Sequence, residues 1–273
     1  MVSKSVTFSG KRKGLSERES YLLSYLSEKR KSIFSLHDVM TVLKCRYENA
    51  KVIAGRLKKK KWIISVAKGK YLIAPLAAGV KGEYTEHEFV LASVIAEPCY
   101  IAYWTALNHY GFTEQVPGTV FVATRKKAKG REIFGTKYKF VSLLAHKFFG
   151  FSEIPVSSYR IKISDKEKTI IDCLDKPGYC GGIEEIVKAV HYAKNEIDFD
   201  KMAKYALKMK NNAVIKRLGF ILDFLGLEPK AKSLENKVSA SYAVLDPTKE
   251  KKGRMNSKWK LRINVSESDL MTW

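Results

Sequence analysis

The stretch KCRYENAKVIAGRLKKKKWIISVAKGKYLI, residues 44–73, decides the fold of the first part of this 273-residue chain. Apolar residues in its first half recur at the i, i+3, i+4, i+7 spacing of a buried helix face, at Ala50, Ile53, Ala54 and Leu57. From Trp62 onward the apolar residues alternate, and Lys68-Gly69 separates two short runs. A glycine turn between such runs is typical of a β-hairpin, so the stretch predicts a helix followed by a hairpin with a basic tip.

Two more helices are expected before this stretch. Ser16 is followed by Glu19, and Ser35 by Asp38, at the spacing at which the two side chains satisfy backbone N–H groups of a first helical turn. Three helices followed by a hairpin is the order of the winged helix-turn-helix, in which the third helix enters the major groove and the wing contacts phosphates. We therefore predict a basic flexible arm over residues 1–15 and a winged helix-turn-helix DNA-binding domain over residues 16–80.

The charge of the chain favours an anionic partner. Lysine and arginine number 50 against 28 acidic residues, a formal net charge of +22. Residues 1–80 hold 18 of these bases and 5 of the acids, so more than half of the excess lies in less than a third of the chain. A basic surface concentrated on a predicted DNA-binding fold indicates double-stranded DNA as the partner.

The residues of the predicted third helix and wing are expected to have two roles toward DNA. Asn pairs with adenine, and Arg or Lys with guanine, so polar side chains on the outward arc are expected to read or border base edges. These candidates are Tyr47, Glu48, Asn49, Lys51, Val52 and Arg56. Lysines at the end of the helix and on the wing are expected to hold backbone phosphates. These are Lys58, Lys59, Lys60, Lys61, Lys68 and Lys70.

Residues 81–273 are predicted to form a mixed α+β domain, so the fold class of the chain is α+β. Helices are expected over residues 86–96, 104–110, 165–174, 183–192, 199–208 and 214–225, and strands over residues 120–123, 140–144, 159–163, 242–245 and 259–265. Ser164 and Glu167 have capping-box spacing. Tyr100, Tyr103 and Trp104 are expected in the core. A basic turn offers a secondary contact to phosphate or to an acidic protein face, through Arg125, Lys126, Lys127, Lys129 and Arg131.

The sequence contains none of the common catalytic or cofactor-binding motifs. The histidines lack metal-ligand spacing, and no phosphate-binding glycine loop or nucleophile elbow occurs, so we expect no metal, no cofactor and no enzyme activity. The four cysteines lack CxxC spacing, and no apolar stretch approaches the ~20 residues of a membrane span. We expect a cytoplasmic protein with reduced cysteines and no membrane partner.

Several short segments, taken in order, resemble the AbiEi family of antitoxins and transcriptional regulators of type IV toxin–antitoxin systems. They are WI at 62–63, KGKY at 68–71, YIAYWTAL at 100–107, HYGFTEQVP at 109–117, SDKEKTIID at 164–172, PG at 177–178 and GG at 181–182. The resemblance covers about Ser16 to Val190. It implies a repressor that binds an inverted repeat in its own promoter, as a homodimer on DNA, through the winged helix. It also implies antitoxin activity in the C-terminal region, against a nucleotidyltransferase-like toxin of the AbiEii family.

Two alternatives from other classes remain open at this point. The first is a nucleic-acid-acting enzyme, a nuclease or nucleotidyl transferase targeted by the winged helix, with Asp165, Glu167 and Asp172 as candidate ligands of a divalent cation. The second is a protein-interaction module whose basic surface neutralises an acidic partner. Metal-dependent turnover would support the first, and partner binding without DNA affinity at low salt would support the second.

Overall fold

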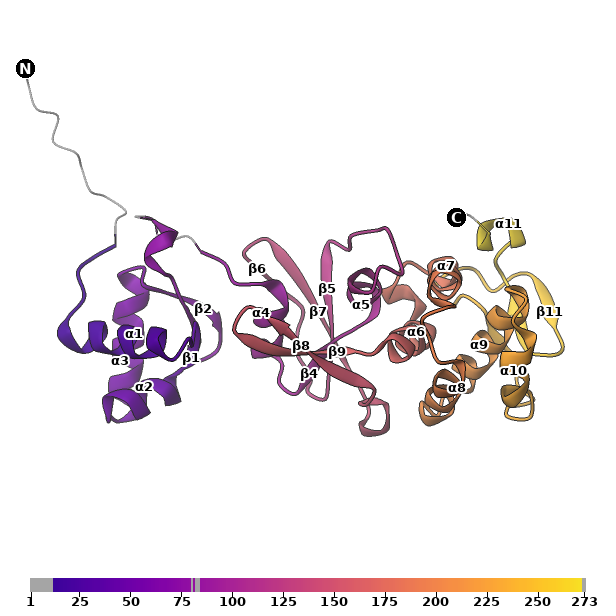
Figure 1. Ribbon diagram of the computed structural model, residues 1–273, viewed down its shortest axis with the longest axis horizontal. Coiled ribbons are helices and arrows are strands. Elements are labelled where there is room, and N and C mark those ends of the chain that lie inside the picture. Colours follow the sequence, from indigo (N-terminus) through magenta and orange to yellow (C-terminus); the bar gives the residue numbers. More distant parts are fainter. Residues whose placement is uncertain (1–11, 80, 82–83, 272–273) are drawn as a thin grey trace, which may run out of the picture. The chain divides into compact units, whose positions relative to one another are not determined.

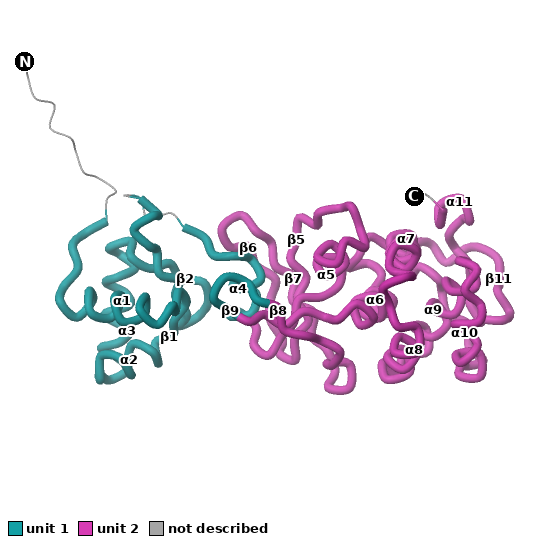
Figure 2. Tube along the Cα trace, viewed as in Figure 1, with its two compact units in different colours: residues 1–95, 155–159 teal, residues 96–154, 160–273 magenta. Residues whose placement is uncertain are grey.

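The computed structural model describes residues 12–79, 81 and 84–271, and these form a mixed α+β fold with three sheets and eleven α-helices (Figure 1). The predicted α+β class is therefore confirmed. The chain divides into two compact units, which Figure 2 colours separately: residues 1–95 with 155–159, and residues 96–154 with 160–273. The first unit thus extends beyond the expected boundary at residue 80. Most of the predicted basic arm, residues 1–11, lies outside the described residues.

The first part of unit 1 contains three helices in the predicted positions and a small antiparallel sheet that includes the predicted hairpin. The helices are α1 (Glu17–Glu28), α2 (Leu36–Leu43) and α3 (Tyr47–Lys59). The strands are β1 (Ile33–Ser35), β2 (Ile63–Ala67) and β3 (Lys70–Ile73), in the order β1-β3-β2. The predicted stripe of α3 is buried, against a core that includes Leu22, Leu26, Phe34 and Val39. The sequence did not predict β1, because three residues are too few to show alternation.

Both predicted capping boxes of unit 1 are present. The Ser16 N–H donates to Glu19 Oε2 at 2.8 Å, and the Ser35 N–H donates to Asp38 Oδ2 at 2.7 Å. The two serine hydroxyls accept the reciprocal bonds from the backbone of Glu19 and Asp38. The starts of α1 and α2 are therefore set by local side chains, as the spacing indicates.

These caps predict an acid sensitivity of unit 1. Burial raises the pKa of Glu19, but hydrogen bonds from Lys60 and Ser16 outweigh it, so the pKa lies below its usual value. A lowered pKa stabilises the fold above the unfolded value of about 4.3, and this contribution is lost as pH falls through the lower folded value. We expect the urea midpoint of unit 1, followed by far-UV circular dichroism, to fall from pH 5 to pH 3.

The Glu19→Gln variant provides the control for this acid sensitivity. It removes the titrating group, so its urea midpoint should depend less on pH. At pH 5 its free energy of unfolding should already be about 1 kcal/mol lower, because the cap and the ion pair with Lys60 are weakened. An identical pH dependence in Glu19→Gln and the unmodified chain would contradict the assignment.

The remainder of unit 1 lies beyond the β2–β3 hairpin. It begins with a 3₁₀ turn, η1 (Leu76–Ala78), and continues to α4 (Glu88–Ile95). Residues 155–159, at a hairpin tip much later in the chain, also belong to this unit. There the Tyr159 hydroxyl lies 2.9 Å from Ser32 Oγ and accepts the Ile33 N–H at 2.9 Å. Such a long-range contact leaves no trace in the local pattern of the sequence.

Unit 2 is built on a six-stranded mixed sheet in the order β6-β7-β5-β4-β9-β8. Its strands are β4 (Cys99–Ile101), β5 (Thr119–Thr124), β6 (Arg131–Ile133), β7 (Thr136–Ser142), β8 (Phe151–Val156) and β9 (Tyr159–Ser164), with the tip between β8 and β9 assigned to unit 1. Strands β5 and β7 run parallel, with Val122 opposite Phe140. Tyr100 and Tyr103 are fully buried, as expected, whereas Trp104 is partly buried against the same core.

Helices and a third sheet complete unit 2 (Figure 1). The helices are α5 (Tyr103–His109), α6 (Lys166–Asp175), α7 (Ile183–Ala193), α8 (Phe199–Lys208), α9 (Asn212–Phe224), α10 (Glu228–Glu235) and α11 (Glu267–Leu270). The sheet has the order β10-β12-β11, from β10 (Ala243–Val244), β11 (Arg254–Asn256) and β12 (Leu261–Ile263).

The predicted cap of α6 is shifted by one residue. Asp165, and not Ser164, is the N-cap, and its side chain accepts the Lys168 N–H at 2.8 Å. The Ser164 hydroxyl instead lies 2.7 Å from Thr169 Oγ1. Glu167 turns away from the cap and accepts the Asp198 N–H at 2.9 Å. The capping box predicted from Ser164 and Glu167 is therefore wrong, because the adjacent aspartate is an equally good N-cap.

Position 219 in α9 has no room for a side chain larger than that of glycine. A Cβ added there would lie 2.1 Å from the ring of the fully buried Trp259, whose Nε1 donates to Asp223 Oδ2 at 2.7 Å. We expect Gly219→Ala to lower the free energy of unfolding by about 2–3 kcal/mol, through overpacking. Urea denaturation followed by near-UV circular dichroism measures this. Gly55→Ala is the matched control, because that helical glycine has nothing within 4 Å and alanine there should add up to about 1 kcal/mol.

Candidate nucleic-acid interface

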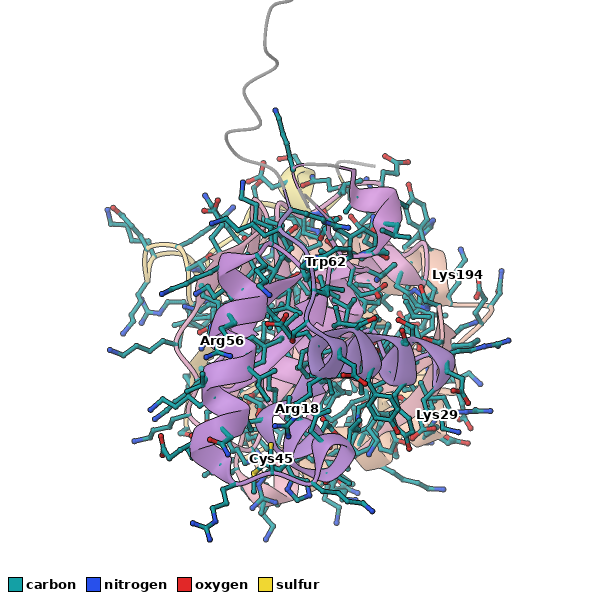
Figure 3. All side chains as sticks on the ribbon, turned by 90° about the vertical axis from the view of Figure 1, so that its left-hand side faces the viewer. Arg18, Lys29, Cys45, Arg56, Trp62 and Lys194 are labelled. Atoms are coloured by element: carbon teal, nitrogen blue, oxygen red, sulfur yellow. The ribbon has the colours of Figure 1, made fainter. Side chains whose placement is uncertain are left out.

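Helix α3 presents a polar face that the rest of unit 1 leaves accessible. Tyr47 and Val52 are 51% and 50% exposed, and Glu48, Asn49, Lys51 and Arg56 are also exposed. Among the described residues, no hydrogen bond or ion pair holds these six side chains. Figure 3 looks toward unit 1, with Arg56 labelled on α3. The structure thus brings all six predicted base-reading side chains to one accessible helix face.

The six lysines predicted to contact phosphates fall into two groups. Lys58, Lys59, Lys61 and Lys68 are exposed. Lys60 instead pairs with the buried Glu19 at 2.5 Å, and Lys70 Nζ donates to the Val94 carbonyl at 2.6 Å. These partners lie 41 and 24 residues away, so the sequence pattern did not reveal them. Both lysines have structural contacts in addition to any role toward DNA.

The start of the described chain lies against the hairpin of unit 1. The Arg12 guanidinium lies 4.6 Å from the centroid of the Trp62 ring and donates to the Ala74 and Pro75 carbonyls at 2.9 and 2.7 Å. Trp62 Nε1 in turn donates to the Lys13 carbonyl at 2.8 Å. Sequence reasoning missed this clamp, although an arginine and a tryptophan at the two ends of a basic region are suitable partners for cation–π stacking.

A basic groove lies beside the α3 face in unit 1. Its walls come from the start of α2, the start of α3, and the turn between β2 and β3. The Leu36 N–H donates to the Gly69 carbonyl at 3.1 Å, which holds the turn against the start of α2. The turn needs Gly69 because its φ is +69°, in the left-handed region. Sequence reasoning did not predict this groove, because its three segments are distant in the chain.

The second predicted basic segment lies in unit 2. Arg125, Lys126, Lys127, Lys129 and Arg131 are all exposed, between the end of β5 and the start of β6. Nearby in the sheet, Lys139 Nζ lies 5.7 Å from the centroid of the Tyr179 ring. The segment is therefore accessible to an anionic partner of unit 2.

The acidic residues considered for metal binding have protein cations as partners. Lys201 lies 3.2 Å from Asp165 and 2.7 Å from Glu167. Burial alone lowers the pKa of Lys201, but its hydrogen bonds to these two carboxylates outweigh burial and raise it. Asp172 is buried in contact with Lys168. Within the described ranges, no group of three or more His, Cys, Asp or Glu residues is placed to hold a metal ion.

In the part of the chain that the structure describes, no helix combines the length and apolar character needed to span a membrane.

Comparison with known proteins informs the fold of this chain. A crystal structure of the RV2827C protein from Mycobacterium tuberculosis matches with a TM-score of 0.67 at 14% sequence identity, covering 96% of this chain and 97% of that one. Neither a protein-family model nor a curated protein matches the sequence. The chain is therefore similar in fold, over nearly its whole length, to the RV2827C protein.

Proposed function

We propose that this chain is a sequence-specific, double-stranded DNA-binding transcriptional regulator and that unit 1 is a winged helix-turn-helix. The order α1-β1-α2-α3-β2-β3 with sheet order β1-β3-β2 supports this assignment. In that motif α3 is the recognition helix and the β2–β3 hairpin is the wing. The N-terminal concentration of positive charge supports the same partner.

The observation that carries the proposal is the face of α3. One side of this helix is buried through Ala50, Ile53, Ala54 and Leu57, and the other side presents Asn49, Arg56 and their neighbours without internal partners in the described structure. Unpartnered amide and guanidinium groups on a rigid helix are suited to bidentate bonds with adenine and guanine.

We further propose that the chain is the antitoxin of a type IV pair that represses its own operon. The support is the resemblance of the segments at 100–117 and 164–172 to the AbiEi family. In this proposal unit 1 binds an inverted repeat as a pair of copies, and unit 2 counteracts a nucleotidyltransferase-like AbiEii toxin. The exposed basic segment at 125–131 is then available to contact an acidic face of that toxin or nearby phosphate.

Footprinting tests the regulator proposal. The purified full-length chain should protect a two-fold repeated sequence upstream of its own gene from DNase I. Absence of any protected region at micromolar protein would contradict the proposal, since specific sites are bound with Kd of about 10⁻⁸–10⁻¹¹ M at physiological salt.

Co-expression tests the antitoxin proposal separately. The product of the neighbouring gene should arrest growth when expressed alone and should be neutralised when this chain is expressed with it. If that product is not toxic, or if its toxicity persists in the presence of this chain, the antitoxin assignment fails and the regulator assignment is unaffected.

A further inference from the structure

The basic groove of unit 1 gathers side chains that bind oxyanions. Six of its lining residues carry titratable groups: His37, Tyr47, Lys51, Lys68, Lys70 and Tyr71. The three lysines bring positive charge from α3, from the β2–β3 turn and from β3. Tyr47 and Tyr71 both line the groove, and burial, followed by the charge of Tyr47, raises the pKa of Tyr71. All six side chains can donate hydrogen bonds, the imidazole and phenols among them.

The groove has no carboxylate among its lining residues to balance this charge. Asp38, on the helix that forms one wall, is held by Lys31 at 2.6 Å and by Ser35 at 2.7 Å. Lys51 and Lys68 have no ion-pair partner among the described residues. Lys70 is fixed at the groove by a single bond to the Val94 carbonyl, which leaves two of its three ammonium hydrogens for other acceptors.

We propose that this groove holds one backbone phosphate of duplex DNA, and that Lys51 and Tyr47 belong to this phosphate site and do not read bases. The proposal rests on the DNA-binding function given above and assigns its contacts more finely. A phosphodiester presents two non-bridging oxygens that share one negative charge, which suits two ammonium groups that line one groove, one from α3 and one from the β2–β3 turn. This phosphate contact would fix the position of α3 in the major groove of the DNA, and Asn49 and Arg56 would read the base sequence.

The salt dependence of DNA binding tests this assignment. Affinity for a 20-base-pair promoter duplex is measured by fluorescence anisotropy between 50 and 300 mM salt, for Lys51→Gln, Lys68→Gln and the double variant. Each neutralised phosphate contributes about 0.9 to the slope of log K against log salt. Because both lysines share one phosphate, the double variant should lose about 0.9 in total. Lys29→Gln, an exposed lysine of unit 1 paired with Glu28, should leave the slope unchanged.

Base specificity gives a second readout. Loss of a phosphate contact weakens all sequences alike, so Lys51→Gln should keep the ratio of promoter to scrambled-duplex affinity. A reduced ratio would return Lys51 to base reading and overturn the proposal. A loss of about 1.8 in the double variant would overturn it too, because it indicates two separate phosphates.

Two further results separate this proposal from the function on which it rests. If the unmodified chain binds the promoter and the double variant has the same slope and affinity, the groove assignment fails and the regulator proposal stands. If the unmodified chain binds no duplex even at 50 mM salt, the DNA-binding function itself fails.

A titration with inorganic phosphate distinguishes a backbone phosphate from a free anion as the ligand of the groove. In a nuclear magnetic resonance experiment without DNA, inorganic phosphate should shift the resonances of the groove residues only at millimolar concentration. Micromolar binding would identify a free-anion site and overturn the proposal.

Discussion

Asp172→Ala is expected to lower the free energy of unfolding of unit 2 by about 3–5 kcal/mol, because it leaves a lysine ammonium buried without its counter-charge. The side chains of Asp172 and Lys168 are both fully buried and in contact. Tyr100 completes the cluster: its hydroxyl donates to Asp172 Oδ2 at 3.0 Å and accepts from Lys168 Nζ at 3.1 Å. The Lys168 ammonium also lies 4.9 Å from the centroid of the Phe149 ring.

Protonation behaviour agrees with a buried structural cluster. Burial, followed by the charge of Asp172, raises the pKa of Tyr100 well above its usual value, so the phenol stays protonated and able to donate. Burial also raises the pKa of Asp172, although Lys168 acts in the opposite direction. Each of the three groups therefore depends on the other two for its polar contacts.

Urea denaturation followed by near-UV circular dichroism measures the effect of Asp172→Ala. The double variant Lys168→Met with Asp172→Leu should be more stable than Asp172→Ala, since it removes both charges together and leaves only the neutral Tyr100 hydroxyl without these partners. Lys166→Ala is the control, because the Lys166–Glu196 pair is partly exposed and worth at most about 1 kcal/mol. Equal losses in Asp172→Ala and Lys166→Ala would contradict the account. The expected instability also means that inactivity of an Asp172 variant is not evidence for a nuclease.

Replacing Asn49 and Arg56 with alanine is expected to remove most of the sequence specificity of DNA binding. Each bidentate base contact is worth about 1–3 kcal/mol of discrimination, so each substitution should weaken promoter binding by about 5- to 150-fold. Both side chains are exposed and lack internal partners in the described structure, so the fold should tolerate their loss.

Anisotropy titrations with promoter and scrambled duplexes measure this loss of specificity. The double variant should bind the two duplexes with similar affinity and keep its non-specific binding, because its phosphate contacts remain. Lys29→Ala on α1 is the matched control and should behave like the unmodified chain. A double variant that retains the full affinity ratio would show that α3 does not read the operator through these residues.

Much of the fold follows from local patterns in the sequence. Ser16 with Glu19 and Ser35 with Asp38 predict the starts of α1 and α2, because capping bonds form within one turn. The apolar spacing from Ala50 to Leu57 predicts α3 and its buried side. In contrast, β1, β4, β6, β8 and β11 were missed; β11 lies at Arg254–Asn256, between the two predicted strands at 242–245 and 259–265. Four of these five strands have only three residues, too few to show alternation.

The candidate site shows the same division. The helical periodicity of α3 correctly predicts which of its side chains are exposed, because exposure on a single helix depends only on the 3.6-residue repeat. The partners of Lys60 and Lys70 could not be predicted, because Glu19 and Val94 reach them through tertiary packing. The groove that brings Lys51 to the same side as Lys68 required the structure for the same reason. The winged-helix function itself stays a prediction.

The most direct test of the central claim is the ratio of affinities for two duplexes at 150 mM salt. One carries the promoter of the gene for this chain, and the other has the same base composition in scrambled order. A sequence-specific regulator should bind the promoter at least about 10³-fold more tightly. Equal affinity for the two duplexes would contradict the account, because it would reduce the basic surface of unit 1 to a general attraction for polyanions.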